Sequence, residues 1–256
     1  MIPYSQALAP FAADVLAGGG LSIAKALAQA LAQALDARDS YTAGHSLRVA
    51  EHAYAMAEEL RLPEGDVEII RLGAWLHDVG KIGIPDAVLQ KAGPLTAEEL
   101  GLVKLHPQIG RKILERAPGF EPLLDSVELH HEDFDGGGYP YGLVGQRIPL
   151  AARVIRVADA FDAMTSDRAY RPGLTAEAAL KEIESGSGRQ FDPSCAAALL
   201  RVVRRRGRRE IGRGTDLLVG GPSVAARRSG RGTRLPPGNG TRAMPLAREV
   251  SAGLIG

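Results

Sequence analysis

The spacing of apolar residues along the chain predicts a succession of amphipathic helices. Val49, Ala53, Met56 and Leu60, for example, recur three or four positions apart, which places them on one face of a helix. On the same grounds we expect helices over residues 21–38, 43–61, 66–78, 97–104, 107–116, 121–132, 149–165, 175–184 and 193–206. No stretch of any length alternates apolar and polar residues as a strand would. The pattern therefore predicts an all-α bundle.

Residues with strong local preferences mark the ends of several of these helices. Thr42 is a candidate cap for the helix over 43–61, and Thr96, in the sequence Thr-Ala-Glu-Glu, for the helix over 97–104. Gly80 is expected to end the helix over 66–78. The run 135–140 contains three successive glycines followed by Tyr-Pro, which predicts a loop.

The composition favours an aliphatic core and a cytoplasmic location. Apolar residues make up 45% of the 256 residues but aromatic residues only 5%, so the core should consist mostly of Leu, Ala, Val and Ile. The single cysteine, Cys195, excludes an internal disulfide and is compatible with a reducing compartment. The first basic residue is Lys25, so no charged start of a signal peptide is present, and no apolar run reaches the ~18 residues of a membrane span.

Charge is distributed unevenly and suggests a division of the chain. Residues 201–256 contain 13 arginines, no lysine and three acidic residues, whereas residues 1–200 carry the remaining 18 basic and 27 acidic residues. We interpret residues 1–20 as a leader or linker, 21–206 as one helical domain, and 207–256 as a disordered, Arg- and Gly-rich tail. A solvated extension is the simplest interpretation of this tail, although arginine-rich tails can bind nucleic acid.

Seven residues form a candidate site for two metal ions. His77 and Asp78 are adjacent, which sets a neutral nitrogen donor beside a carboxylate whose two oxygens can each bind an ion. The full set is His45, His77, Asp78, His106, His130, His131 and Asp159. These nitrogen and oxygen ligands, without sulfur, suit divalent Fe, Mn or Zn. Paired metals of this kind usually activate water against a phosphate ester.

Three neighbouring residues have less certain roles. Lys81 lies three residues after Asp78, about one helical turn, so its ammonium could reach a phosphate or a leaving oxygen. His52 is on the helix of His45 but ~10 Å along its axis, so we expect it to be structural or exposed. Asp162 could either support the metal ligands or pair with Arg168.

The motifs together resemble an HD-GYP domain, the bacterial subclass of the HD phosphohydrolase superfamily. They occur in family order between about residues 30 and 200 as Tyr41-Thr-Ala-Gly-His45-Ser, His77-Asp-Val-Gly-Lys81-Ile-Gly-Ile-Pro85, His106-Pro107, His130-His131-Glu132 with Asp135-Gly136, Gly138-Tyr139-Pro140, and Val157-Ala-Asp159-Ala-Phe-Asp162-Ala. The resemblance implies an all-α, metal-dependent phosphodiesterase that cleaves cyclic di-GMP to pGpG and perhaps to GMP. It also implies that cyclic di-GMP is the main partner.

The resemblance also assigns roles to residues. It implies that one metal is held by His45, His77, Asp78 and Asp159, and the other by Asp78, His106, His130 and His131, so that Asp78 bridges the two ions. Lys81 and Asp78 are then the expected catalytic residues. For substrate binding it implies Arg168, Arg171, Tyr139 and Gly138, with the two arginines on the second phosphate of the dinucleotide. The glycines of this GYP loop, residues 138–140 and those just before them, should permit positive φ angles, and the loop is expected to contact other signalling proteins.

The sequence departs from the family at two places. Some members carry an acidic residue at the position of Tyr41, which recruits a third metal, so we expect two metals here; Asp39 is a weaker candidate for support of the site. Where most members have a basic residue followed by Trp, this chain has Asp133-Phe134, and the added carboxylate could weaken binding of an anionic ligand. Two other functions therefore stay open, a hydrolase of another nucleotide and a non-catalytic sensor of cyclic di-GMP. The helix over 21–38, apolar on more than one face, could pair two copies of the chain.

Overall fold

Helices make up the whole of the described architecture. The computed structural model describes residues 20–38, 44–91, 93–167 and 172–216. Its elements are α2 (Gly20–Arg38), α3 (His45–Glu59), α4 (Glu64–Leu76), the 3-10 helix η1 (Val79–Gly83), α5 (Asp86–Leu89), α6 (Ala97–Val103), α7 (His106–Leu114), η2 (Glu121–Leu123), α8 (Leu124–Glu128), η3 (Gly145–Arg147), α9 (Leu150–Thr165), α10 (Ala176–Gly186) and α11 (Pro193–Asp216). Within these ranges the only β contact is an isolated bridge between Ser187 and Phe191, which confirms the all-α prediction.

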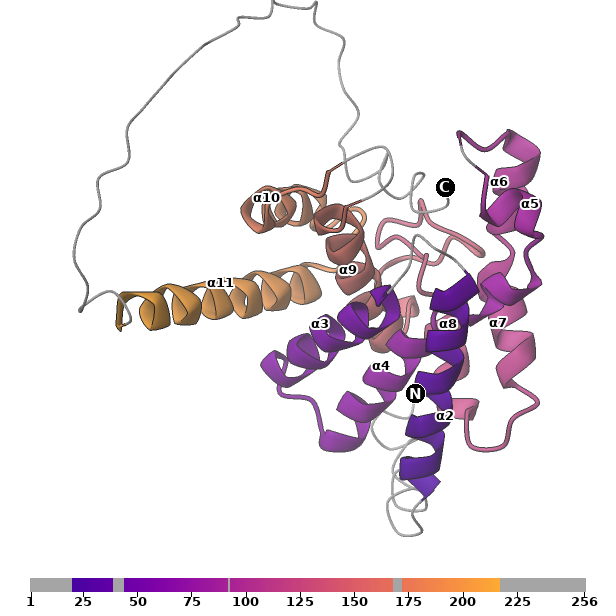
Figure 1. The fold of residues 1–256 in the computed structure, drawn as a ribbon, viewed down its shortest axis with the longest axis horizontal. Helices are drawn as coiled ribbons and strands as arrows, with labels where there is room; N and C mark the ends of the chain where they lie inside the picture. Colours follow the sequence, from indigo (N-terminus) through magenta and orange to yellow (C-terminus); the bar gives the residue numbers. More distant parts are fainter. Residues whose placement is uncertain (1–19, 39–43, 92, 168–171, 217–256) are drawn as a thin grey trace, which may run out of the picture.

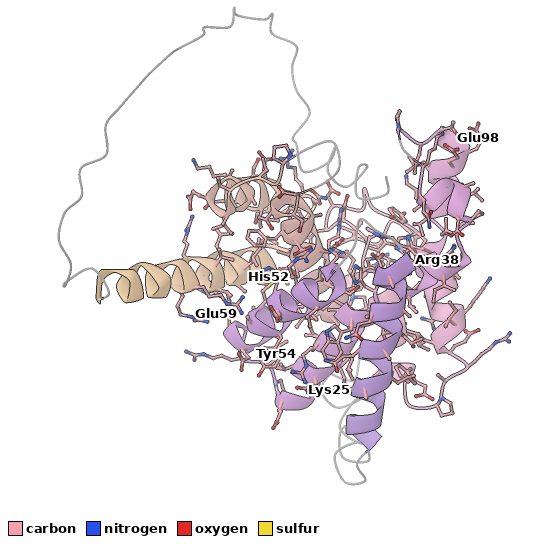
Figure 2. The ribbon with its side chains drawn as sticks, in the orientation of Figure 1. Lys25, Arg38, His52, Tyr54, Glu59 and Glu98 are labelled. Carbon is pink, nitrogen blue, oxygen red and sulfur yellow. The ribbon has the colours of Figure 1, made fainter. Side chains whose placement is uncertain are left out.

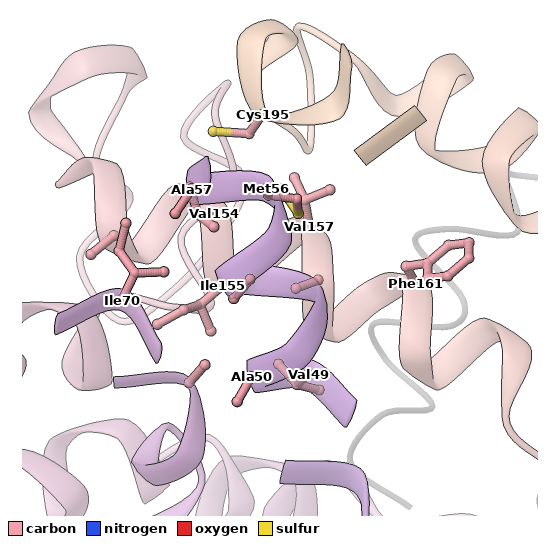
Figure 3. Close-up of a cluster of buried hydrophobic side chains, with 14 of the residues drawn as sticks. Val49, Ala50, Met56, Ala57, Ile70, Val154, Ile155, Val157, Phe161 and Cys195 are labelled. Carbon is pink, nitrogen blue, oxygen red and sulfur yellow. The ribbon is translucent and has the colours of Figure 1, made fainter. Parts of the chain in front are cut away.

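The core is aliphatic, as the composition predicted, and it lies where α3, α4 and α9 meet (Figure 3). Val49 and Met56 from α3, Ile70 from α4, and Ile155 and Val157 from α9 are all almost fully buried. Each such side chain contributes roughly 1.5–3 kcal/mol when it leaves water. This core fixes the three helices that carry or flank His45, His77 and Asp159.

A tight helix end at Leu60 turns the chain from α3 into α4. The N–H of Leu62 donates to the carbonyl of Ala57 (3.2 Å) and that of Arg61 to the carbonyl of Glu58 (2.9 Å), which is the Schellman pattern. Its left-handed residue is Arg61 (φ 58°), a position that glycine usually fills. The break between the helices predicted over 43–61 and 66–78 is therefore confirmed, although α4 begins two residues earlier than predicted, at Glu64.

The local signals at helix ends have mixed outcomes. Thr96 caps α6 with the full capping box, because its side chain accepts from Glu99 N–H while the Glu99 carboxylate accepts from Thr96 N–H. Thr42 lies outside the described residues, and α3 instead begins after Gly44, whose φ is 71°. The helix predicted over 121–132 was too long, because α8 ends at Glu128 and leaves His130 and His131 beyond it.

Helix α2 stands beside α4 with its C-terminal end near η1 (Figure 1). Ala28, Ala32 and Leu35 form its buried face, whereas Leu27 on another face is about half exposed. Pairing of two copies through this helix stays a prediction. No helix in the described part of the chain is both long enough and apolar enough to cross a membrane.

Helix α11 continues to Asp216, ten residues beyond the end that the sequence predicted. Arg201 and Arg205 fasten it to α3, because both guanidinium groups bind the carboxylate of Glu59. The predicted leader (residues 1–19) and the remainder of the predicted tail (217–256) lie outside the described residues, so both stay predictions.

His52 lies in α3 (Figure 2) and packs against α9, in agreement with the structural role expected as one of its two alternatives. Its ring stands edge-on against Phe161, with centroids 5.1 Å apart. Burial lowers its pKa from 6.5 to about 4, although Asp162 opposes this shift. The imidazole is therefore neutral in the folded protein at pH 7.

This neutral imidazole predicts a loss of stability in acid. A folded-state pKa below the unfolded value means that stability is full above pH 6.5 and is lost as the pH falls toward 4. From pH 7 to pH 5 the free energy of unfolding should fall by about 2 kcal/mol more in the wild type than in His52→Gln. Urea unfolding at both pH values measures this difference, and equal decreases in the two proteins would contradict the assignment.

Candidate metal centre

The structure brings together all seven residues that the sequence singled out as metal ligands. Every one of them is buried, and they sit mostly at the ends of helices. His45 and His106 are the first residues of α3 and α7, His77-Asp78 connects α4 to η1, and His130-His131 follows α8. Only Asp159, in α9, lies inside a helix.

The seven side chains form two groups that could each hold a metal ion. Asp78, His106, His130 and His131 make one group, and His45, His77 and Asp159 the other; within each, the candidate ligand atoms lie within 4.8 Å of one another. Asp78 stands between the groups. Its Oδ1 is 3.2 Å from His106 Nε2, and its Oδ2 is 3.4 Å from His77 Nε2.

Backbone carbonyls fix the orientation of three of the histidines. The Nδ1 atoms of His77, His106 and His130 lie 2.7–2.8 Å from the carbonyl oxygens of Ala74, Val103 and Val127, in each case three residues earlier. A carbonyl only accepts, so each Nδ1 carries a proton, and in the neutral imidazole each Nε2 then has a lone pair that faces the cluster. This bond also explains why His130 can serve as a ligand just after α8.

These lone pairs require a cation. His77 Nε2 is buried and makes no hydrogen bond with any described residue. The Nε2 atoms of His106 and His130 face each other at 3.3 Å. Burying acceptors in this way is unfavourable unless something positive binds them. The donor set therefore fits divalent metal ions.

Asp162 supports His45. Its Oδ2 is 2.7 Å from His45 Nδ1, and its Oδ1 accepts from Arg48 Nε at 2.7 Å. This contact agrees with the first of the two roles left open for Asp162, support of the candidate metal ligands; the partner in the other role, Arg168, lies outside the described residues. Burial alone would lower the pKa of His45, but Asp159 and Asp162 raise it to about 10. The carboxylates therefore stabilise a positive charge at this ring.

Lys81 lies against the central carboxylate. Its Nζ is 2.8 Å from Asp78 Oδ2, and both residues are buried. Burial would raise the pKa of Asp78, but the neighbouring ammonium of Lys81 holds it well below its usual range. Asp78 is therefore ionised and available to cations on either side.

Gly80 allows η1 to approach α7 closely. A β-carbon there would lie 1.9 Å from the backbone oxygen of His106, which no side chain could tolerate. Gly80 was expected to end a helix, but η1 continues through it. Its physical role is to bring Asp78 and Lys81 next to His106.

The GYP loop contacts the site through His131. The ring of Tyr139 stacks on that of His131 (centroids 4.7 Å apart, planes at 18°), and Tyr139 N–H donates to the His131 carbonyl. The predicted positive φ is found at Gly136 (87°). Gly138 is required for a different reason, since a β-carbon there would lie 2.2 Å from Asp133 N.

Glu132 is a residue for which the sequence suggested no role. Its carboxylate accepts from Tyr141 N–H (2.7 Å) and Leu143 N–H (2.9 Å). It therefore ties the chain that leaves the GYP loop to the residue directly after His131. Its position within the His-His-Glu motif was the only sequence signal for it.

Asp133 has a charged partner that the sequence did not indicate. It is buried and accepts from Arg156 of α9 (2.8 Å and 3.1 Å), so its negative charge is compensated within the protein. The expectation that this carboxylate repels an anionic ligand is thus weakened by the pairing. In the sequence, Arg156 stood out only because it is an arginine among apolar residues, three positions before Asp159.

Some predicted residues lie outside the described part of the chain. These are Asp39, Tyr41 and the two arginines expected to bind substrate, Arg168 and Arg171. Their roles stay predictions.

Comparison with known proteins relates the chain to one domain family. A model of the HD domain family matches residues 27–195. The cyclic di-GMP phosphodiesterase response regulator RpfG of Xanthomonas campestris is 47% identical over 173 residues, covering 67% of this chain and 46% of RpfG. A cyclic di-GMP phosphodiesterase of Thermotoga maritima is 42% identical (65% and 46% covered), and 3'3'-cGAMP-specific phosphodiesterase 3 of Vibrio cholerae is 38% identical (68% and 38%). The chain thus spans less than half the length of these relatives.

Solved structures share the fold. A cyclic GMP-AMP specific phosphodiesterase of V. cholerae (V-cGAP3) matches 70% of this chain and 48% of its own, with a TM-score of 0.56 and 20% identity. An HDG"Y"P protein of Bdellovibrio bacteriovorus, Bd1817, matches 76% of this chain and 68% of its own, also with a TM-score of 0.56 and 20% identity. At such identities the likeness concerns the architecture alone.

The orphaned histidine nitrogens predict that metal stabilises the fold. Adding Mn²⁺ to metal-free protein at about 100 times its Kd should raise the free energy of unfolding by about 3 kcal/mol. Thermal melting with measurement of bound metal tests this. His77→Ala should lose most of the increase, whereas His52→Gln should keep it. An unchanged melting temperature in the wild type would contradict the fit to metal.

The buried Asp133–Arg156 pair predicts coupled effects on stability. Arg156→Met should lower the free energy of unfolding by about 3–5 kcal/mol, because Asp133 would then be a buried charge without its partner. The double variant with Asp133→Ala should lose clearly less than the sum of the two single variants. Urea unfolding of the four proteins gives the coupling, and additive losses would exclude it.

Proposed function

Because this chain belongs to the HD domain family, we propose that it is a metal-dependent phosphodiesterase that hydrolyses cyclic di-GMP. The observation that carries the proposal is the position of Asp78 between two buried groups of ligands. A carboxylate with one oxygen toward each group is the arrangement that a shared, bridging ligand needs.

We assign the ligands accordingly. His45, His77 and Asp159 with Asp78 would hold one ion, and His106, His130 and His131 with Asp78 the other. When bound, two divalent ions of Fe, Mn or Zn would activate water and neutralise charge on the phosphate. The hydrogen bonds to Ala74, Val103 and Val127 keep three of the imidazoles turned toward the ions.

Lys81 would supply the remaining charge for the reaction. Its ammonium is held at the edge of the cluster, 2.8 Å from Asp78 Oδ2, where burial strengthens its electrostatic effect. From this position it can contact a phosphate oxygen or the leaving sugar oxygen as negative charge develops there. Asp78 and Lys81 are therefore the residues whose loss should affect turnover most.

The choice of substrate rests on the relatives. Those with the higher identities reported above are named for cyclic di-GMP, and the V. cholerae protein at 38% for 3'3'-cGAMP. Both molecules carry two phosphates, so a cation beyond the metals is needed, for which Arg168 and Arg171 stay the candidates. Tyr139 and Gly138 would border the substrate, and pGpG or GMP would be the product.

The partners and the location of the protein complete the proposal. Tyr141 and Val144, just after the GYP loop, are more than half exposed and offer an apolar contact to other signalling proteins. A homodimer and a cytoplasmic location are also expected. The sensor alternative loses its main support, because Asp133 is paired with Arg156.

Hydrolysis of cyclic di-GMP tests the proposal directly. Metal-loaded wild type should convert it to pGpG or GMP, and Asp78→Ala should be slower by at least about 100-fold, because the shared ligand is lost. Product separation by HPLC measures this, with His52→Gln as the active control.

Other outcomes separate the alternatives. Faster turnover of 3'3'-cGAMP than of cyclic di-GMP would show that 3'3'-cGAMP is the preferred substrate. Binding of cyclic di-GMP without turnover by fully metal-loaded wild type would establish the sensor, and turnover that survives Asp78→Ala would refute the proposed site.

A further inference from the structure

Arg38, the last residue of α2, reaches across to the segment that carries Lys81. Its Nη1 donates to the backbone oxygens of Lys81 (3.0 Å) and Ile82 (2.8 Å), and its Nη2 to that of Ile84 (2.7 Å). Asp86 completes the contact, since its Oδ1 accepts from Nε and Nη2 of the same guanidinium. Figure 2 shows Arg38 at the end of α2 that faces this region.

These carbonyls lie at and just beyond the C-terminal end of η1, where that of Lys81 also accepts from Ile84 N–H (3.0 Å). Carbonyls at the C-terminal end of a helix carry partial negative charge, so a cation there is stabilising. The planar guanidinium presents five donors in a fixed fork and can bind three carbonyls and a carboxylate together. Lysine has one ammonium group and cannot make all of these contacts at once.

Helix η1 is held from both sides. On one side Gly80 lies against α7, where the backbone approach leaves no room for a β-carbon. On the other side stands Arg38, and between them Lys81 directs its ammonium to Asp78 Oδ2 at 2.8 Å. The side chain of Lys81 can keep this direction only while its own backbone is fixed.

We propose that Arg38 is a positioning residue for Lys81, and that the site therefore depends on the placement of α2. The inference rests on the role of Lys81 in the proposed function. Helix α2 is itself held by the packing of Ala28, Ala32 and Leu35, so the Arg38 guanidinium extends from a helix that is fixed in place. A displacement of this helix would move the backbone of Lys81 with it.

Steady-state kinetics with two substrates test the role of Arg38. With cyclic di-GMP and with bis(p-nitrophenyl) phosphate, Arg38→Met should lower kcat about 10-fold, since misplacing a charged group by about 1 Å can cost up to 100-fold. KM and bound metal should stay close to wild type, and Arg38→Lys should recover part of the rate. Arg201→Met, which removes an arginine that also ties two helices together, should keep full activity.

A double variant separates positioning from general support. In the Lys81→Met background, Arg38→Met should cause little further loss of kcat, because its effect passes through Lys81. Hydrogen exchange of the wild type and Arg38→Met should show faster exchange confined to residues 79–86.

The outcomes distinguish this inference from the proposed function. An unchanged kcat in Arg38→Met, a loss that persists undiminished without Lys81, or a loss explained by missing metal or global unfolding would overturn the role of Arg38. Wild-type turnover of bis(p-nitrophenyl) phosphate but not of cyclic di-GMP would overturn the substrate assignment. The kcat of the wild type and of Arg38→Met could then still be compared with bis(p-nitrophenyl) phosphate. Turnover of neither diester by metal-loaded wild type would overturn both.

Discussion

Buried lone pairs and carboxylates that face a common centre impose the main constraint on this structure. Five histidines and two aspartates meet with their side chains buried, and the Nε2 of His77 finds no donor among the described residues. Such a cluster is unfavourable for folding unless positive charge occupies it. The surrounding chain supplies this compensation only in part, through Lys81 at Asp78 and through the raised pKa of His45. The need for further cations links the stability of the domain to its chemistry.

Helix ends explain how a bundle can bring so many ligands to one place. A side chain inside a helix competes with its neighbours for space, whereas residues at a terminus can turn toward a point that several helices share. His45 and His106 begin helices, and His77 and His130 follow them. In His77, His106 and His130 the Nδ1–H donates to the backbone carbonyl three residues earlier. The geometry of the site is therefore set largely by the backbone, with the aliphatic core of α3, α4 and α9 holding the helices in place.

The sequence predicted what depends on local pattern and missed what depends on contact. Apolar spacing predicted the helices, and the Thr96 motif predicted its capping box, because both features depend on residues that are close together in the sequence. The seven candidate ligands were singled out because histidines and aspartates are chemically distinctive, and the structure gathers them in two groups. The end of α8 at Glu128 could not be read from an apolar pattern that continues past it. The pairing of Asp133 with Arg156 joins residues 23 positions apart, and neither residue alone indicates the other.

Arg38 illustrates the most hidden class of interaction. Three of its partners are backbone carbonyls, which every residue possesses and which therefore leave no trace in the sequence. It differs from Arg156, whose guanidinium binds the buried carboxylate of Asp133. Arg38 instead joins the end of one helix to the end of another, so its contacts transmit position rather than charge. A shift of α2 along its packed face would therefore move the backbone of Lys81 through these hydrogen bonds.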